Sequence, residues 1–190
     1  MKDIIIKIIE KYLEIFPEEK ERQEKLIKYL EKYDNSEIVN YNNFEGHITA
    51  SGFIYSLEEK KLLMIFHKKA QCYLNSGGHS DLEDESPLVT AKREIREETG
   101  ITGLKTLGIT DEEFIPIDID THIIPYDANR NLPEHYHFDF SYFFVVDKIK
   151  NVEIEKEEVD NYKLVNIEDL YNNNHYGKMM FKIEKLLSTK

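Results

Sequence analysis

Residues 86–101, SPLVTAKREIREETGI, restrict the fold of this chain more than any other segment. Ser86 is a typical helix N-cap, Pro87 suits the first helical position, and Gly100 is typical of the residue that ends a helix. One face of the predicted helix carries the apolar side chains Leu88, Ala91 and Ile95. Such a stripe must be buried against another layer, so the segment predicts a helix that packs on a core.

Three carboxylates lie on the opposite face of this helix. Glu94, Glu97 and Glu98 occupy positions i, i+3 and i+4, so their side chains project together. Oxygen-rich groups of this kind suit hard cations such as Mg²⁺ and Mn²⁺. Arg93 lies one turn before Glu97 and could orient its carboxylate or offset the repulsion. Taken alone, the three glutamates are more simply explained as a solvated acidic helix face, and the surrounding sequence decides against that interpretation.

The segments around the helix are rich in strand-forming residues. GHITASGFIYS and KLLMIFHKK predict two strands joined by a turn, and CYLNSGG a short strand or loop that ends in two glycines. After the helix, the expected strands are LKTLGI, EFIPIDIDTHIIP, HYHFDFSYFFVVD and EVDNYKLV, and KMMFKIEKLL predicts a C-terminal helix. Strands flanked by helices predict an α/β fold, with a mixed β-sheet covered by helices on both faces.

The N-terminal part differs from the rest. Residues 3–15 carry apolar side chains at helical spacing, and Pro17 begins a second amphipathic segment. We therefore predict an N-terminal helical extension over residues 1–40 and a main domain over residues 41–190. The extension is expected to be a packing element or the contact surface of a homodimer.

Composition excludes several classes of partner. The formal net charge of the chain is -12. Nucleic acid polymers and anionic membrane surfaces are also negatively charged and are bound through Lys and Arg, so the net charge argues against both as partners. The single cysteine, Cys72, allows no disulfide framework and fits a reducing cytoplasm. The N-terminus lacks the uninterrupted apolar run of a signal peptide or membrane span. The expected partner is a small molecule.

Residues 77–101, GGHSDLEDESPLVTAKREIREETGI, resemble the Nudix box, G-x5-E-x7-R-E-U-x-E-E-x-G-U, where U is a bulky aliphatic residue. The second half matches at every fixed place: Arg93, Glu94, Ile95, Glu97, Glu98, Gly100 and Ile101. The first half has one extra residue, so either Asp84 or Glu85 fills the early acidic place. The segments NFEGHITASGFIY, NSGGHSD and EHYHFDFSYFF are similar to a bacterial branch of Nudix proteins that also has N-terminal helices.

The resemblance implies a Nudix fold, an α/β/α sandwich, and a metal-dependent pyrophosphohydrolase. The expected substrate is a nucleoside diphosphate linked to another moiety, such as a nucleotide sugar, an ADP-ribose-like molecule or a nucleotide. Mg²⁺ or Mn²⁺ would be held by Glu94, Glu97, Glu98 and the carbonyl of Gly78, with one glutamate able to act as base. Arg93 belongs to the same expected catalytic set.

A second group of polar residues is spaced two apart, as expected for side chains on one face of a β-strand. DIDTH places Asp118, Asp120 and His122 on one face of a strand, and HYHFD does the same for His135, His137 and Asp139. In a hairpin that pairs His122 with His135, all six side chains would share one face. That face is either a solvent-exposed polar surface or a site for substrate or a second metal. His79 and Glu85, in the loop before the box helix, are further candidates for such contacts.

Two other functions remain open at this point. Isopentenyl-diphosphate isomerases share the Nudix fold but need a Cys and Glu pair for proton transfer, and the intact REIREETG segment favours hydrolysis. A Nudix-like nucleotide-binding regulatory module is the other alternative, although such modules usually lose glutamates of the box, which this chain keeps.

Overall fold

The computed structural model describes residues 1–110, 112, 115–128 and 130–189. The helices are α1 (Lys2–Ile15), α2 (Lys20–Lys32), α3 (Asn35–Ile38), α4 (Pro87–Thr99) and α5 (Gly177–Thr189), with short 3-10 turns at Pro17–Glu19 and Ile167–Leu170. The strands are β1 (Gly46–Ser56), β2 (Lys61–His67), β3 (Cys72–Leu74), β4 (Ser76–His79), β5 (Lys105–Thr106), β6 (Asp118–Ile124), β7 (His135–Val146) and β8 (Val159–Val165).

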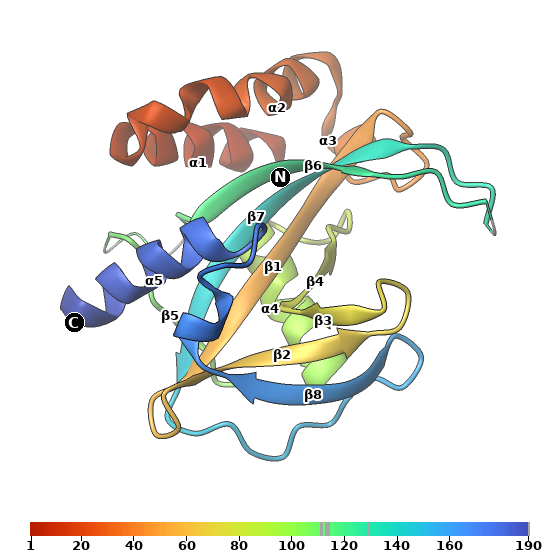
Figure 1. The fold of residues 1–190 in the computed structure, drawn as a ribbon. Helices are drawn as coiled ribbons and strands as arrows, with labels where there is room; N and C mark the ends of the chain where they lie inside the picture. Colours follow the sequence, from red (N-terminus) through yellow and green to blue (C-terminus); the bar gives the residue numbers. More distant parts are fainter. Residues whose placement is uncertain (111, 113–114, 129, 190) are drawn as a thin grey trace.

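The strands form one mixed sheet whose centre is the pair β1 and β7 (Figure 1). These two long strands run parallel and pair from Gly46 opposite Tyr136 to Ser56 opposite Val146. β4 pairs with β1, and β6 and β5 pair with β7, in each case antiparallel. β2 pairs with the last residues of β1, on the same edge as β4 and opposite β7, and also pairs with β3 and β8. The mixed sheet predicted from the sequence is confirmed.

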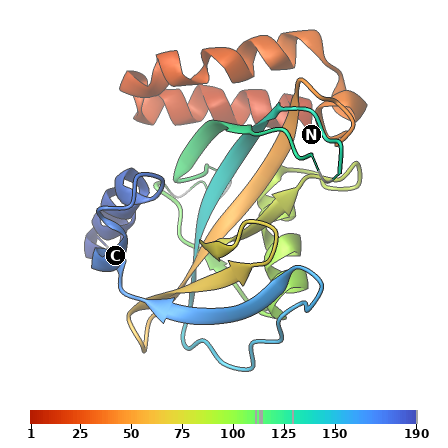
Figure 2. The same ribbon diagram turned by 45° about the vertical axis from the view of Figure 1, so that its right-hand side comes forward.

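Helices cover both faces of this sheet, as the two views in Figures 1 and 2 show. Alternate side chains of β1 point to opposite faces, and each face has its own apolar core. Ile48, Ala50 and Ile54 of β1 belong to the core that includes α1, α2 and α4. Phe53 and Tyr55 of β1 belong to the second core, which includes α5. The layers are therefore helix, sheet and helix, as expected for a Nudix fold.

Helix α4 begins and ends where the local sequence signals place it. The Ser86 side chain accepts a hydrogen bond from the backbone N–H of Val89, and Pro87 is the first helical residue. Gly100 ends the helix in the left-handed conformation, with φ +70°, which costs glycine little because it has no Cβ. Ala91 and Ile95 are fully buried against the sheet. Glu98 is buried on the same side, contrary to the prediction that all three glutamates lie on the opposite face, because it follows Ala91 and Ile95 at helical spacing.

The N-terminal helices are joined to the sheet by buried ion pairs as well as by apolar contacts. Arg22 on α2 contacts Asp118 through two bonds of 2.6 Å and 2.9 Å, and Asp120 through one of 2.9 Å. Lys182 on α5 lies 3.1 Å from Asp118 and 2.8 Å from Glu19. These charges hold the pKa of Asp118 below its ordinary value although burial acts in the opposite direction. The network ties α2, β6 and α5 together.

The division of the chain at residue 40 stays a prediction. Ile5, Ile8 and Leu26 of the helical extension lie in the same buried cluster as Ile48 and Phe138 of the sheet. None of the helices in the described part of the chain is long and apolar enough to cross a membrane.

The predicted register of the β6–β7 hairpin was wrong by two residues. His122 pairs with His137, Asp120 with Asp139 and Ile124 with His135. A bridge between Asp127 and Leu132 continues the same register toward the tip of the hairpin. Because side chains alternate with a period of two, this shift leaves every predicted side chain on its predicted face. Alternation alone therefore could not distinguish the two registers. Residues 113 and 114, at the start of the predicted strand segment, lie outside the described residues.

Candidate active site

The three glutamates of α4 line the side of the helix that faces β4. Glu98 is almost fully buried and accepts a hydrogen bond of 3.0 Å from the backbone N–H of Gly77. Glu94 is half-buried and lies against Gly78, whereas Glu97 is exposed. A Cβ added to Gly78 would lie 2.5 Å from the carboxyl carbon of Glu94. Glycine at this position therefore lets the carboxylate approach the backbone closely.

Arg93 organises the acidic cluster from its outer side. Its guanidinium lies 2.8 Å from Glu94 and 3.0 Å from Glu97, and it also donates to the backbone carbonyl of His79 at 2.7 Å. The same group contacts Asp84 at 2.8 Å. Asp84 is buried and accepts a hydrogen bond from Thr90 as well, whereas Glu85 is exposed. Of the two acids that could fill the early acidic place, Asp84 is the one that contacts the arginine.

Burial controls the protonation of Glu98. It raises the pKa of Glu98 to about 8, the N–H of Gly77 opposes this, and the charges of Glu94 and Glu158 add to it. A cation nearby would reverse this effect because it favours the charged form. Glu98 is thus a buried carboxyl group whose pKa lies close to neutral pH. Such a group suits either a metal ligand or a base.

Two residues outside the box helix lie close to Glu98. One ligand atom each from His67, Glu98 and Glu158 lie within 4.8 Å of one another. Glu158 also forms an ion pair with Lys69. His67 ends β2, and Glu158 directly precedes β8, so the pairing of these two strands brings them to α4. Sequence analysis missed both, because neither belongs to a local pattern and only the sheet places them together.

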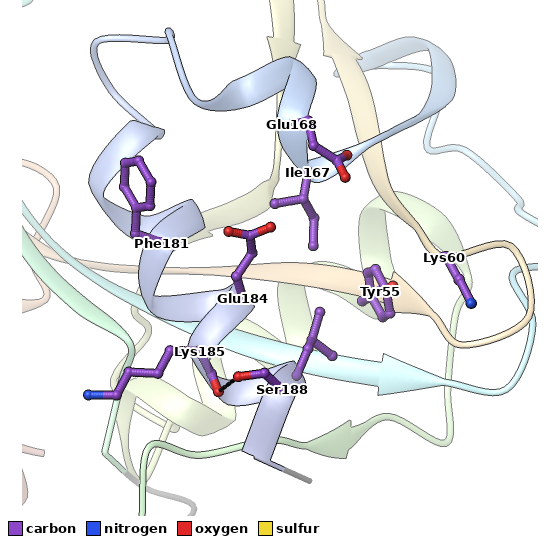
Figure 3. Close-up of a pocket in the computed structure, with 9 residues that line it drawn as sticks. Tyr55, Lys60, Ile167, Glu168, Phe181, Glu184, Lys185 and Ser188 are labelled. Atoms are coloured by element: carbon purple, nitrogen blue, oxygen red, sulfur yellow. Dashed lines mark hydrogen bonds between the residues drawn. The ribbon is translucent and has the colours of Figure 1, made fainter.

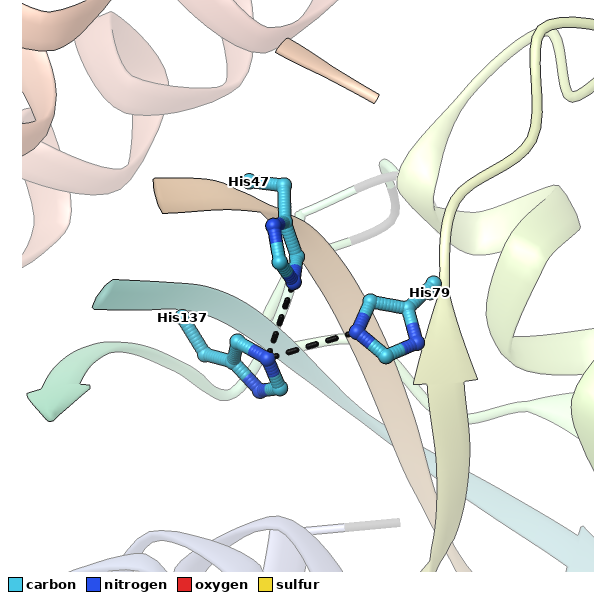
Figure 4. Close-up of side chains that lie close together, drawn as sticks. All are labelled: His47, His79 and His137. Carbon is cyan, nitrogen blue, oxygen red and sulfur yellow. Dashed lines mark hydrogen bonds between the residues drawn. The ribbon is translucent and has the colours of Figure 1, made fainter. Parts of the chain in front are cut away.

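A separate cluster of histidines lies near the end of the β1–β7 pair (Figure 4). Nε2 of His137 on β7 lies 3.0 Å from Nε2 of His47 on β1 and 3.3 Å from Nε2 of His79 at the end of β4. His47 is buried and His79 exposed. Burial, with the neighbouring histidines, lowers the pKa of His47 to about 3 and also lowers that of His137. His47 was not among the residues predicted from sequence.

The comparisons with known proteins agree with this geometry. The sequence profile of the NUDIX domain matches residues 46–183. The chain belongs to the Nudix family.

Relatives and solved structures of Nudix proteins extend over most of the chain. A protein of Lactococcus lactis subsp. cremoris (strain MG1363), named as a probable DHNTP pyrophosphohydrolase, is 33% identical over 142 residues, which are 74% of this chain and 75% of the relative. A NUDIX hydrolase of known structure from Clostridium perfringens is 25% identical, with a TM-score of 0.55, over 75% of this chain and 97% of that chain. The E. coli dihydroneopterin triphosphate pyrophosphohydrolase, at 13% identity and a TM-score of 0.52, covers 70% of this chain and 91% of its own and shows likeness of fold alone.

Nudix hydrolases generally use divalent metals, and the residues of this Nudix hydrolase fit one. Glu94, Glu97 and Glu98 offer carboxylate oxygens from one helix face, and the missing Cβ of Gly78 leaves room beside Glu94. The assignment of the three glutamates and of the Gly78 carbonyl as metal ligands stays a proposal.

The other predicted residues of this Nudix hydrolase lie around the histidine cluster. His135 is buried, with its ring centre 4.9 Å from that of His47. His122 forms a 2.9 Å contact with Asp120, and although burial acts in the opposite direction, this contact raises the pKa of His122. Asp139 accepts hydrogen bonds from Thr49, Ser51 and Ser141. Asp120 and Asp139 therefore already have partners and are positioned to orient neighbours rather than to act as unoccupied ligands.

A depression of about 730 Å³ lies elsewhere on the surface, between the end of β1 and α5 (Figure 3). Tyr55, Ile167 and Phe181 give it apolar walls, and Glu168 and Glu184 lie at its sides. None of the carboxylates and histidines described above lines it. Its chemistry therefore offers no reason to place the reaction there.

Proposed function

We propose that this Nudix hydrolase is a divalent-cation-dependent pyrophosphohydrolase whose active site is formed by Glu94, Glu97 and Glu98 next to Gly77 and Gly78. The observation that carries the proposal is the contact between this helix face and β4. Glu98 accepts the N–H of Gly77 at 3.0 Å, and the Glu94 carboxylate occupies the space that a side chain at residue 78 would fill. A dense group of carboxylates in so small a space favours a cation.

The chain's own residues would hold the reacting groups in place. Arg93 fixes Glu94 and Glu97 at 2.8 Å and 3.0 Å, so the carboxylates need little reorganisation when a cation and a diphosphate bind. When bound, Mg²⁺ or Mn²⁺ would neutralise phosphate charge and lower the pKa of the attacking water. One of the three glutamates would act as the base that accepts a proton from this water.

We propose a class of substrates and not a single compound. The relative from Lactococcus lactis is named for DHNTP, so DHNTP is the first compound to test. The family resemblance described above also supports nucleoside diphosphates linked to a second moiety, including nucleotide sugars and ADP-ribose-like molecules. All of these contain a phosphoanhydride bond, and the carboxylate site would act on that bond in each case.

A substrate panel tests the proposal directly. We expect the protein to release phosphate or pyrophosphate from one of DHNTP, a nucleoside triphosphate, ADP-ribose, a nucleotide sugar, a dinucleoside polyphosphate or NADH, when Mg²⁺ or Mn²⁺ is present. Addition of EDTA should abolish the release, because the carboxylates alone cannot offset the phosphate charge. Turnover that is unaffected by EDTA would contradict metal dependence. Binding of a panel compound without any turnover would instead favour a nucleotide-binding module.

A further inference from the structure

We propose that His47, His79 and His137 form a second metal site, which binds one Zn²⁺ ion and is separate from the carboxylate site of α4. The proposal does not depend on which substrate the enzyme hydrolyses. It goes beyond the proposed function, because the pyrophosphohydrolase reaction described above uses none of these three imidazoles.

The spacing of the three nitrogens is the first argument. The three Nε2 atoms converge, with separations of 3.0 Å and 3.3 Å measured from His137 (Figure 4). Ligands about 2.05 Å from a tetrahedral zinc ion are about 3.3 Å apart. The separations of His137 from His47 and from His79 are close to this value, and the ligand atoms of all three histidines lie within 4.8 Å of one another. Little movement of the backbone or side chains would be needed to bind the ion.

Hydrogen bonding between the rings does not account for this arrangement. A nitrogen of neutral imidazole carries either one proton or one in-plane lone pair. Nε2 of His137 can therefore form one good hydrogen bond, either to His47 or to His79, and its second close neighbour then lacks a matching proton or lone pair. A cation between the three atoms would accept all three lone pairs at once.

The surroundings keep the imidazoles ready to bind a metal. His47 is buried and His137 is half-buried, so both rings are largely shielded from water. Nδ1 of His47 is buried without a hydrogen-bond partner among the described residues. The exposed side chain of His79 leaves a route for the ion from solvent.

The strand β4 separates this site from the carboxylates. His79 pairs with Thr49 and lies on the sheet face that carries His47 and His137, whereas a side chain at Gly78 would point toward Glu94 on the other face. Imidazole nitrogen suits Zn²⁺, and carboxylate oxygen suits Mg²⁺. The two faces therefore favour different ions. Among the described residues the cluster provides three protein ligands, and this number leaves a fourth position for water or a substrate oxygen.

Metal binding, measured without an activity assay, tests the proposal. Protein stripped with a chelator and then dialysed against Zn²⁺ should retain about one tightly bound equivalent by elemental analysis, and Co²⁺ should give the visible absorption of a tetrahedral site. His79→Ala and, separately, His137→Ala should weaken Zn²⁺ binding by ~10²-fold or more, since each removes one of three ligands. His79 is exposed, so its replacement should leave the fold intact.

Two controls separate this site from the active site. His175→Ala, an exposed histidine outside the three-histidine cluster, should bind Zn²⁺ as the parent does. A variant with Glu94, Glu97 and Glu98 all replaced by Gln should also keep its Zn²⁺, even if it is inactive. The proposal is overturned if the parent retains no stoichiometric Zn²⁺, or if the two cluster variants bind Zn²⁺ as tightly as the parent. Loss of Zn²⁺ in the triple Gln variant would also overturn it, by placing the ion at the carboxylates.

Discussion

Glu98→Gln should lower turnover by ~10²-fold or more and, in the metal-free protein, should raise stability at neutral pH. The first effect follows from the loss of a carboxylate that is proposed to bind the metal or accept a proton. The second follows from its burial, because the folded protein must keep Glu98 protonated or accept a buried charge. Gln has nearly the same shape and carries no charge.

The pH dependence of the second effect has a definite sign. In the folded protein the pKa of Glu98 is about 8, well above the value of about 4.3 in an unfolded chain. A group with a raised folded pKa contributes its full stability below the unfolded pKa and loses it as pH rises toward the folded pKa. The advantage of Glu98→Gln should therefore grow from about pH 4.3 to pH 8, reaching about 4 kcal/mol at pH 7, and then level off.

Urea unfolding in EDTA at several pH values measures the stability, and phosphate release with Mg²⁺ or Mn²⁺ measures the turnover. Glu24→Gln on α2 is the matched control, since this glutamate is exposed and its ion pair among the described residues is with Lys28 on its own helix, at 3.6 Å. It should change neither quantity. Near-normal turnover of Glu98→Gln, or a stability difference that does not vary with pH, would contradict the assignment of Glu98.

Arg22→Met should destabilise the protein by about 3 kcal/mol at neutral pH, because it removes the arginine that contacts the buried carboxylate of Asp118. Arg22 contacts Asp118, which is almost fully buried, and also Asp120, so its loss affects two charges together. Lys182 remains 3.1 Å from Asp118 and limits the effect. Urea unfolding of the parent and the variant measures the difference.

Acid should reduce this difference. The pKa of Asp118 is held low in the folded parent, so its stabilising effect is present above the unfolded pKa and is lost as pH falls through the folded pKa. The parent should thus lose its advantage over Arg22→Met at low pH. Lys28→Met is the control on the same helix, because its ion pair is exposed and such pairs contribute little. A deficit of Arg22→Met no larger than that of Lys28→Met would show that the buried network adds nothing to stability.

Local patterns were enough to predict helix α4 and its glutamates. The cap at Ser86, the proline at the first position and the glycine at the end act within a few residues, so the sequence contains the whole signal. The choice between Asp84 and Glu85 was different. Both lie in one loop, and only the three-dimensional course of that loop decides which of them contacts Arg93.

The histidine cluster could be predicted only in part, because the pairing of distant strands brings its members together. HYHFD marked His137 and the double glycine marked His79, but His47 has no local signal, because it follows Gly46 at the start of an ordinary strand pattern. It meets His137 only because β1 and β7 are parallel neighbours. The same applies to His67 and Glu158, which the pairing of β2 with β8 brings to Glu98.

The parallel pair β1–β7 also determines when the protein can fold during its biosynthesis. Gly46 pairs with Tyr136 and Ser56 with Val146, so the ribosome must complete β7 before the centre of the sheet can form. Until then β1 lacks its partner β7, and its apolar side chains stay exposed and can bind chaperones or other nascent chains. Protease resistance of ribosome-bound chains should therefore appear only once residue 146 has left the ribosome, and resistance in chains ending before β7 would rule this out. For such a protein, the speed of translation through the second half of the message governs how long the first half is exposed.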